Sequence, residues 1–221
     1  MKHAKFTDEE ENIEEKKENI FDVILGAGIE PELPKSRALS LYADIDEETA
    51  SLIVPALLSL KDSGKYMEPK DPNDEKCEEL IEKYESIKFY ISTHGGSAHE
   101  MFSIYDMMKV IQKECEIETF GMGKVMSAGV LLLSAGTKGK RKISANCRIM
   151  IHPVSAASMG DIHDIENDTK EIKLLQTQYV KALVNETSMT EKYLKSLIRK
   201  KVNTYFSAED AIRLGIVDEI M

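Results

Sequence analysis

The chain has 221 residues, a hydrophobic content of 42% and a formal net charge of −10 at pH 7. This length suffices for one domain with a sizeable core, and the negative charge argues against nucleic acid or an anionic membrane as the main partner. No apolar stretch approaches the ~18 residues of a membrane span, and the charged N-terminus is unlike a signal peptide. Three cysteines without metal-ligand spacing suggest reduced thiols in a cytoplasmic protein: Cys77, Cys115 and Cys147.

Residues 1–35 differ in composition from the rest of the chain, with ten acidic residues against five lysines. A small apolar island at residues 20–25 interrupts the charges, and Pro31 and Pro34 end the segment. We predict a mobile, acidic N-terminal extension before a single domain of residues 36–221. A solvated tail without a specific role explains this composition at least as well as a functional segment.

Strand and helix patterns alternate from residue 37 onward. Residues 37–42 predict a short strand, and Asp44 or Asp46 can cap a helix whose apolar positions recur at helical spacing: Leu52, Ile53, Ala56, Leu57 and Leu60. A polar stretch at residues 64–85 follows. Within it, the charged residues 73–85 predict a helix capped by Asn73.

Two turns follow apolar strands further along the chain. Residues 89–93 predict a strand that leads into Gly95-Gly96 and then into a helix with one apolar face: Met101, Ile104, Tyr105, Met108 and Ile111. A short strand at 119–121 should turn at Ser127 into a helix over 130–135. A further apolar strand, residues 148–152, ends at His152.

Ser127 and His152 suggest hydrolytic chemistry. A helix start presents unpaired N–H groups and a partial positive charge that favour an alkoxide, and an imidazole is a suitable base for the hydroxyl. Gly95 and Gly96 would let a backbone N–H face a substrate carbonyl oxygen. Taken singly, such a serine is usually a helix N-cap and such a histidine usually structural. The three features together favour a serine hydrolase without the Gly-x-Ser-x-Gly elbow.

Five motifs occur in order: Gly95-Gly96, Gly-x-x-x-Ser-x-Gly at 123–129 before a Leu-rich helix, Ala-Gly-x-Lys-Gly-Lys-Arg at 135–141, Arg-x-Met-Ile-His at 148–152, and Ser-Ala-x-x-Ala-x-x-x-Gly-x-x-Asp at 207–218. Together they resemble the proteolytic subunits of the Clp protease family (ClpP), from about residue 36 to the C-terminus. The resemblance implies an α/β fold of the ClpP/crotonase type, a spiral of strand-strand-helix units. It also implies a projecting handle helix at about 160–186 and marks residues 64–85 as an insertion.

By this resemblance, Ser127 is the nucleophile, His152 is the general base, and the backbone N–H groups of Gly96 and Ala128 form the oxyanion hole. The family's orienting aspartate is replaced by Asn203. An amide oxygen can still orient the imidazole, but it cannot stabilise an imidazolium by charge. We therefore expect reduced or conditional hydrolysis rather than none.

Three further departures from the family concern substrate and assembly. Residues 153–157 replace a Gln-Pro-x-Gly-Gly stretch that helps to bind extended peptide, and Val202 replaces an arginine that pairs across the ring interface. His94 stands at the usual proline position before the glycines, where we interpret it as a turn residue rather than a second base.

The resemblance implies the proteolytic subunit of an ATP-dependent protease, a serine endopeptidase that cleaves extended polypeptides through an acyl-enzyme. It would work in a chamber of stacked homo-oligomeric rings fed by an AAA+ unfoldase, gated by the N-terminal extension, with no metal or cofactor. Two alternatives stay open: a ClpP-like head-maturation protease of a virus, and a weakly active or non-catalytic ring subunit, which only Asn203 supports. An acyl-CoA enzyme of the crotonase type would share the fold, but that function would not explain the presence of Ser127 and His152.

Overall fold

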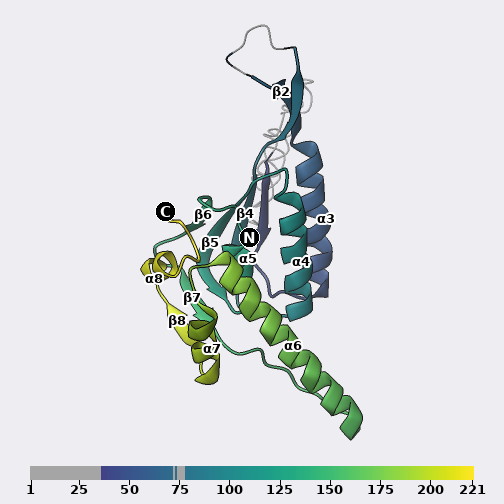
Figure 1. The fold of residues 1–221 in the computed structure, drawn as a ribbon, viewed down its shortest axis with the longest axis vertical. Helices are drawn as coiled ribbons and strands as arrows, with labels where there is room; N and C mark the ends of the chain where they lie inside the picture. Colours follow the sequence, from purple (N-terminus) through teal and green to yellow (C-terminus); the bar gives the residue numbers. More distant parts are fainter. Residues whose placement is uncertain (1–35, 72, 74–77) are drawn as a thin grey trace, which may run out of the picture. The chain divides into compact units, whose positions relative to one another are not determined.

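The computed structural model describes residues 36–71, 73 and 78–221, so the predicted extension at residues 1–35 lies outside the described residues. The unit from Arg37 to Met221 has a mixed α/β fold built around a mostly parallel sheet (Figure 1). The expected fold class is confirmed. In the described part of the chain, no helix combines the length and the apolar character needed to cross a membrane.

The main sheet has seven strands: β1 (Ala38–Leu41), β4 (Ile87–Thr93), β5 (Ile117–Met126), β6 (Arg141–Ile143), β7 (Arg148–Ile151), β8 (Thr204–Phe206) and β9 (Glu219–Ile220). Strands β1, β4, β5, β6 and β9 lie side by side in that order and are parallel. Strand β7 pairs in parallel with β5, and β8 pairs antiparallel with β7.

Strand β5 changes its partner along its length. Its residues 119–121 pair with residues 141–143 of β6, whereas residues 124–126 pair with residues 148–150 of β7. Gly123 lies between the two stretches with a φ of 62°, a left-handed backbone that glycine adopts without steric cost. The end of β5, and therefore Ser127, is placed beside the end of β7.

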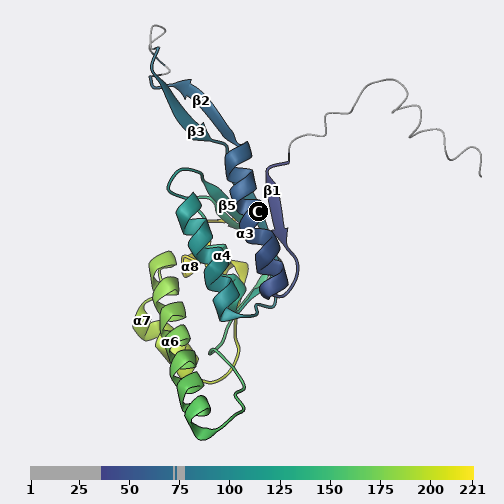
Figure 2. The ribbon, with the colours of Figure 1, turned by 90° about the vertical axis from the view of Figure 1, so that its right-hand side faces the viewer.

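Six helices accompany the sheet in the described residues: α3 (Glu47–Ser63), α4 (Ala98–Ile111), α5 (Ala128–Ser134), α6 (Ile162–Glu186), α7 (Glu191–Arg199) and α8 (Ala208–Arg213). Helices α3 and α4 run side by side (Figure 2). Asp46 caps α3, since its carboxylate accepts from the Thr49 N–H at 2.8 Å. The predicted apolar face of α4 is buried at Met101, Ile104, Met108 and Ile111.

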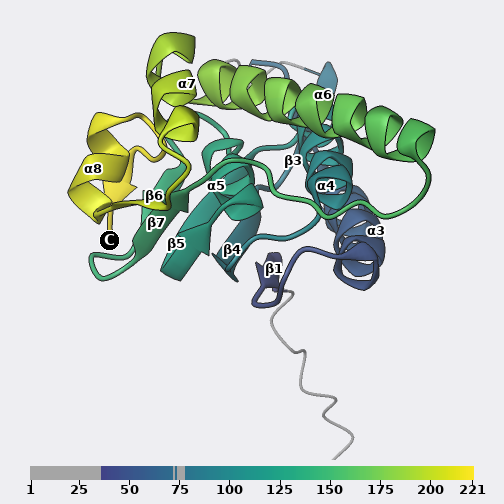
Figure 3. The same ribbon diagram turned by 90° about the horizontal axis from the view of Figure 1, so that it is seen from below.

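Helix α6, the long helix in Figure 3, has buried residues only in its C-terminal half. Its C-terminal half packs against the core through Leu175, Tyr179 and Leu183. Its N-terminal half is solvent-exposed, including Ile162 at 68% and Ile165 at 41%. The helix therefore projects from the core, and it leaves apolar side chains uncovered within this chain.

Residues 64–85, predicted as an insertion, contain a β-hairpin, so the predicted helix over 73–85 is wrong. Strands β2 (Lys65–Pro69) and β3 (Leu80–Tyr84) pair antiparallel. Glu82 pairs with Lys65 and Lys83 with Glu68 across the two strands. The charges that suggested a solvated helix instead form cross-strand pairs, which stabilise a hairpin. Residues 74–77 of the predicted helix lie outside the described residues.

A buried guanidinium joins four parts of the fold. Arg141 of β6 is 5% exposed, and its Nε donates to Asp218 Oδ2 at 2.8 Å. Its Nη1 donates to the carbonyls of Ser134, Glu186 and Gly215, at 3.2, 2.8 and 2.9 Å. These carbonyls lie at the ends of α5 and α6 and in the turn after α8. One side chain therefore donates a hydrogen bond to all three.

The Arg141–Asp218 pair predicts a pH-dependent stability. Hydrogen bonds from Arg141 lower the pKa of Asp218 below its ordinary value, against the opposing effect of burial. Because the folded pKa is depressed, the stabilisation is complete above the unfolded pKa of about 3.9 and is lost as pH falls through the folded pKa. We expect Asp218→Asn to lower the free energy of unfolding by about 2–3 kcal/mol at pH 7.

Urea titrations at pH 7 and pH 3 measure this effect. The difference in free energy of unfolding between the wild type and Asp218→Asn should be smaller at pH 3. The control is Glu219→Gln, which removes an exposed ion pair with Lys142 and should cost less than about 1 kcal/mol. An equal loss for Asp218→Asn at both pH values would show that the carboxylate charge contributes nothing.

Candidate active site

Ser127 occupies the turn between β5 and α5 in a strained backbone conformation. Its φ is 53° and its ψ is −122°, and such a conformation in a non-glycine residue costs about 1–3 kcal/mol and must be held by its surroundings. The Ser127 N–H donates to the Met150 carbonyl at 2.8 Å, and its carbonyl accepts from the Val130 N–H at 3.0 Å. Ser127 is the N-cap residue of α5 by position, but its side chain makes no capping hydrogen bond, so the hydroxyl is not used to cap the helix.

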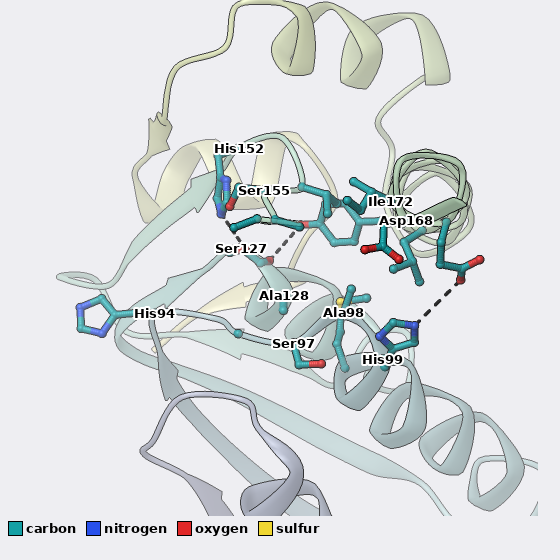
Figure 4. Close-up of a pocket in the computed structure, with 18 residues that line it drawn as sticks. His94, Ser97, Ala98, His99, Ser127, Ala128, His152, Ser155, Asp168 and Ile172 are labelled. Carbon is teal, nitrogen blue, oxygen red and sulfur yellow. Dashed lines mark hydrogen bonds and ion pairs between the residues drawn. The ribbon is translucent and has the colours of Figure 1, made fainter. Parts of the chain in front are cut away.

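His152 faces this hydroxyl. It follows β7 directly, and its Nε2 lies 2.8 Å from Ser127 Oγ (Figure 4). The pairing of β7 with the end of β5 brings the two residues together, although 25 positions separate them in the chain. An imidazole with an unprotonated Nε2 at this distance can accept the hydroxyl proton as the oxygen attacks an acyl group.

The glycine turn packs directly against Ser127. Gly95 and Gly96 have φ values of 104° and 151°, and a Cβ at Gly95 would lie 2.6 Å from the Cβ of Ser127. A Cβ at Gly96 would lie 2.1 Å from the carbonyl oxygen of Ile45. The Ile45 N–H donates to the Gly95 carbonyl, and the Ser97 N–H donates to the Ile45 carbonyl. Only glycine fits at either position, and the turn is fixed on both sides.

Two backbone donors near Ser127 remain available. Among the described residues, the N–H groups of Gly96 and Ala128 donate to no protein acceptor. Ala128 is the first residue of α5, where the helix itself leaves the N–H unpaired. A Cβ at Gly95 would lie 3.1 Å from the Ala128 nitrogen, so the glycine turn and the helix start are adjacent. Such donors can stabilise negative charge on an oxygen bound between them.

Asn203 directly precedes β8, the strand that pairs with β7. The antiparallel register joins Ile151 to Thr204, and its continuation sets Asn203 opposite His152. Asn203 is exposed, and within the described part of the chain no hydrogen bond joins it to the imidazole. Its orienting role stays a prediction. His94 is also exposed, with its Nδ1 3.8 Å from Asp44 Oδ1, and its ring points away from Ser127 (Figure 4).

A cavity of about 480 Å³ opens beside Ser127 and His152. Residues 154–157, part of the stretch predicted to depart from the family's peptide-binding pattern, form part of its wall, and Met101, Ile172 and Leu175 contribute apolar surface. The carboxylates of α6, Asp168 and Glu171, also line it. No three His, Cys, Asp or Glu side chains in the described residues lie together as a metal site would require.

One polar contact at this site could not be predicted from the sequence motifs. Tyr179 of α6 donates its O–H to the carbonyl of Ser127 at 2.9 Å. Tyr179 lies at helical spacing from the buried residues Leu175 and Leu183 of that helix, a pattern that indicates burial only. A tyrosine at a buried position of such a pattern is a signal in itself, because its hydroxyl needs a partner. The pattern does not say which partner.

Comparison with known proteins agrees with the motifs. The family model described as Clp protease matches residues 78–221, well over half of the chain. The chain is also similar to the ATP-dependent Clp protease proteolytic subunit 2 of Frankia casuarinae, with 32% identity over 197 residues that cover 88% of this chain and 80% of the relative. This protein therefore belongs to the Clp protease family of serine-type peptidases.

Proposed function

We propose that this chain is the proteolytic subunit of an ATP-dependent protease, with Ser127 as nucleophile and His152 as general base. The observation that carries the proposal is the 2.8 Å contact between Ser127 Oγ and His152 Nε2 at the start of α5. The name of the Frankia casuarinae relative supports it. The viral and non-catalytic alternatives are not favoured, because that relative is a proteolytic subunit and because both reactive side chains are present in contact.

The reaction begins when His152 Nε2 accepts the proton of the Ser127 hydroxyl as Oγ attacks the scissile carbonyl carbon. The carbonyl oxygen becomes an oxyanion and receives hydrogen bonds from the N–H groups of Gly96 and Ala128. These donors act mainly in the transition state, because negative charge develops on that oxygen only then.

The tetrahedral intermediate collapses when the imidazolium of His152 gives its proton to the leaving amine. The C–N bond breaks and an ester joins the acyl group to Ser127 Oγ. Water then attacks this ester with His152 again as base, which releases the second product and restores the hydroxyl. Each step uses protein groups that lie around the cavity.

A fluorophosphonate probe tests the nucleophile. Labelling should occur at Ser127, identified by the mass of the modified peptide, and Ser127→Ala and His152→Ala should each reduce it by at least about 10³-fold. Ser196→Ala, a change on α7 away from the cavity, should label as the wild type does. Labelling at another serine, or none in the assembled protein, would overturn the catalytic assignment.

Asn203 is proposed as the residue that orients His152. Asn203 directly precedes Thr204, which pairs with Ile151, the residue before His152; this proximity supports the role, since an amide oxygen can accept from Nδ1. An amide would fix the tautomer that leaves Nε2 unprotonated. It would not compensate the positive charge that His152 gains in the transition state.

Substitutions at Asn203 distinguish orientation of the His152 ring from stabilisation of its positive charge. Asn203→Ala should lower the kcat for short peptides by about tenfold, whereas Asn203→Asp should keep it at or above the wild-type value because a carboxylate also stabilises the imidazolium. Lys200→Ala, at a nearby exposed residue that does not line the cavity, is the control and should change kcat little. Full activity of Asn203→Ala would remove Asn203 from the catalytic group.

The proposed substrates are extended polypeptides, delivered by an AAA+ unfoldase into a chamber of stacked homo-oligomeric rings in the cytoplasm. Uncovered Ile162 and Ile165 on α6 support burial of this helix against another subunit. Cys115 and Cys147 are free thiols, which agrees with a reducing compartment. The extension at residues 1–35 is proposed to gate the entrance.

Assembly through α6 can be tested by light scattering. The wild type should run as a large oligomer, and Ile162→Glu should shift it toward single rings or smaller species, because a charge replaces buried apolar surface. Asn167→Glu adds the same charge on a different face of the exposed helical segment and should leave the mass unchanged. A wild type that is monomeric at micromolar concentration would contradict the proposed assembly.

A further inference from the structure

The hydroxyl of Tyr179 contacts the backbone of Ser127 rather than any side chain. The donor lies 2.9 Å from the Ser127 carbonyl oxygen, and the tyrosine is 5% exposed. Burial raises the pKa of Tyr179, so the phenol keeps its proton and remains a donor at all physiological pH values. The contact joins α6 to the turn between β5 and α5.

The bonded carbonyl shares a peptide group with the N–H of Ala128. That group is planar, so its C=O and N–H are held in opposite directions and turn together. The Val130 N–H also donates to the Ser127 carbonyl, but Val130 belongs to the same helix start and moves with it. Tyr179 is therefore the donor that holds this peptide group from an independent element.

We propose that Tyr179 is a positioning residue that aims the Ala128 N–H at the oxyanion by fixing the Ser127 carbonyl. This inference rests on the proposed function, because it gives the Ala128 N–H a role in acyl transfer. The hydrogen bond has a second effect, since a donor on the carbonyl polarises the peptide and strengthens its N–H as a donor. Such a restraint is needed because the φ of 53° at Ser127 is strained. If the turn relaxed, the same peptide group would rotate.

The alternative is that Tyr179 only fills space between α5 and α6. Its ring belongs to the hydrophobic core, and the ring alone would serve that purpose. Tyr179→Phe distinguishes the two roles because it keeps the ring and removes only the donor. Steady-state hydrolysis of a short peptide and inhibition by a peptide boronic acid, whose tetrahedral adduct places an oxygen in the oxyanion site, are the measurements.

Tyr179→Phe should lower kcat by about tenfold with KM within about twofold of the wild type, a smaller loss than deletion of an oxyanion donor causes. Affinity for the boronic acid should fall by about the same factor as kcat/KM. The matched control is Tyr105→Phe. Tyr105 also donates a half-buried O–H at 2.9 Å, from α4 to Glu186 of α6, and among the described residues its hydroxyl makes no hydrogen bond to the Ser127 turn. This control should retain the wild-type kcat and boronic-acid affinity.

Three outcomes would overturn the inference. The first is an unchanged kcat in Tyr179→Phe, and the second is a change in KM alone. The third is an equal decrease in kcat in Tyr179→Phe and Tyr105→Phe, which would indicate general loosening of α6. The wild type separates this inference from the proposed function. If the wild type hydrolyses peptide and binds the boronic acid while Tyr179→Phe does the same, only the role of Tyr179 fails. If the wild type does neither, the proposed function fails as well.

Discussion

The strained backbone of Ser127 is the constraint around which the candidate active site is built. A left-handed turn at a non-glycine residue persists only where neighbours hold it, and here they come from three separate elements. The carbonyl of Met150 on β7 accepts from its N–H, the turn at Gly95 packs against its Cβ, and Tyr179 on α6 donates to its carbonyl. The same neighbours fix the direction of Oγ and of the helix start, so the fold stabilises the conformation that the chemistry needs.

More distant parts of the chain determine whether those neighbours are in place. The switch of β5 from β6 to β7 brings His152 to Ser127, and it depends on Gly123. Arg141 joins β6 to the ends of α5 and α6, so the two helices that meet at Ser127 share one buried anchor. Two of the five sequence motifs, at 135–141 and 207–218, contain this anchor and its partner Asp218. Their function is structural, although they help to identify the family.

Local patterns predicted the main helices and the strand before each turn, because helical spacing and strand-to-helix punctuation are properties of short segments. The pairing of Ser127 with His152, which are 25 positions apart, came from the resemblance to the Clp protease motifs. The hairpin at residues 65–84 was missed, since alternating charges suit a solvated helix as well as cross-strand pairs. The fit of Gly96 against Ile45 and the hydroxyl contact of Tyr179 join segments about 50 residues apart, which no periodicity encodes. Periodicity indicates that a residue is buried, but it does not identify the hydrogen-bond partner of its polar atom.

A crystal structure of the protein with a peptide boronic acid bound to Ser127 tests the central claim most directly. The account predicts a covalent bond from Oγ to boron and one boronate oxygen within hydrogen-bonding distance, about 2.7–3.1 Å, of both the Gly96 and the Ala128 nitrogens. Ser127 should keep its left-handed φ, with the Tyr179 hydroxyl still on its carbonyl. An adduct whose oxygen points away from both nitrogens, or a Ser127 turn that relaxes when the adduct forms, would contradict the account.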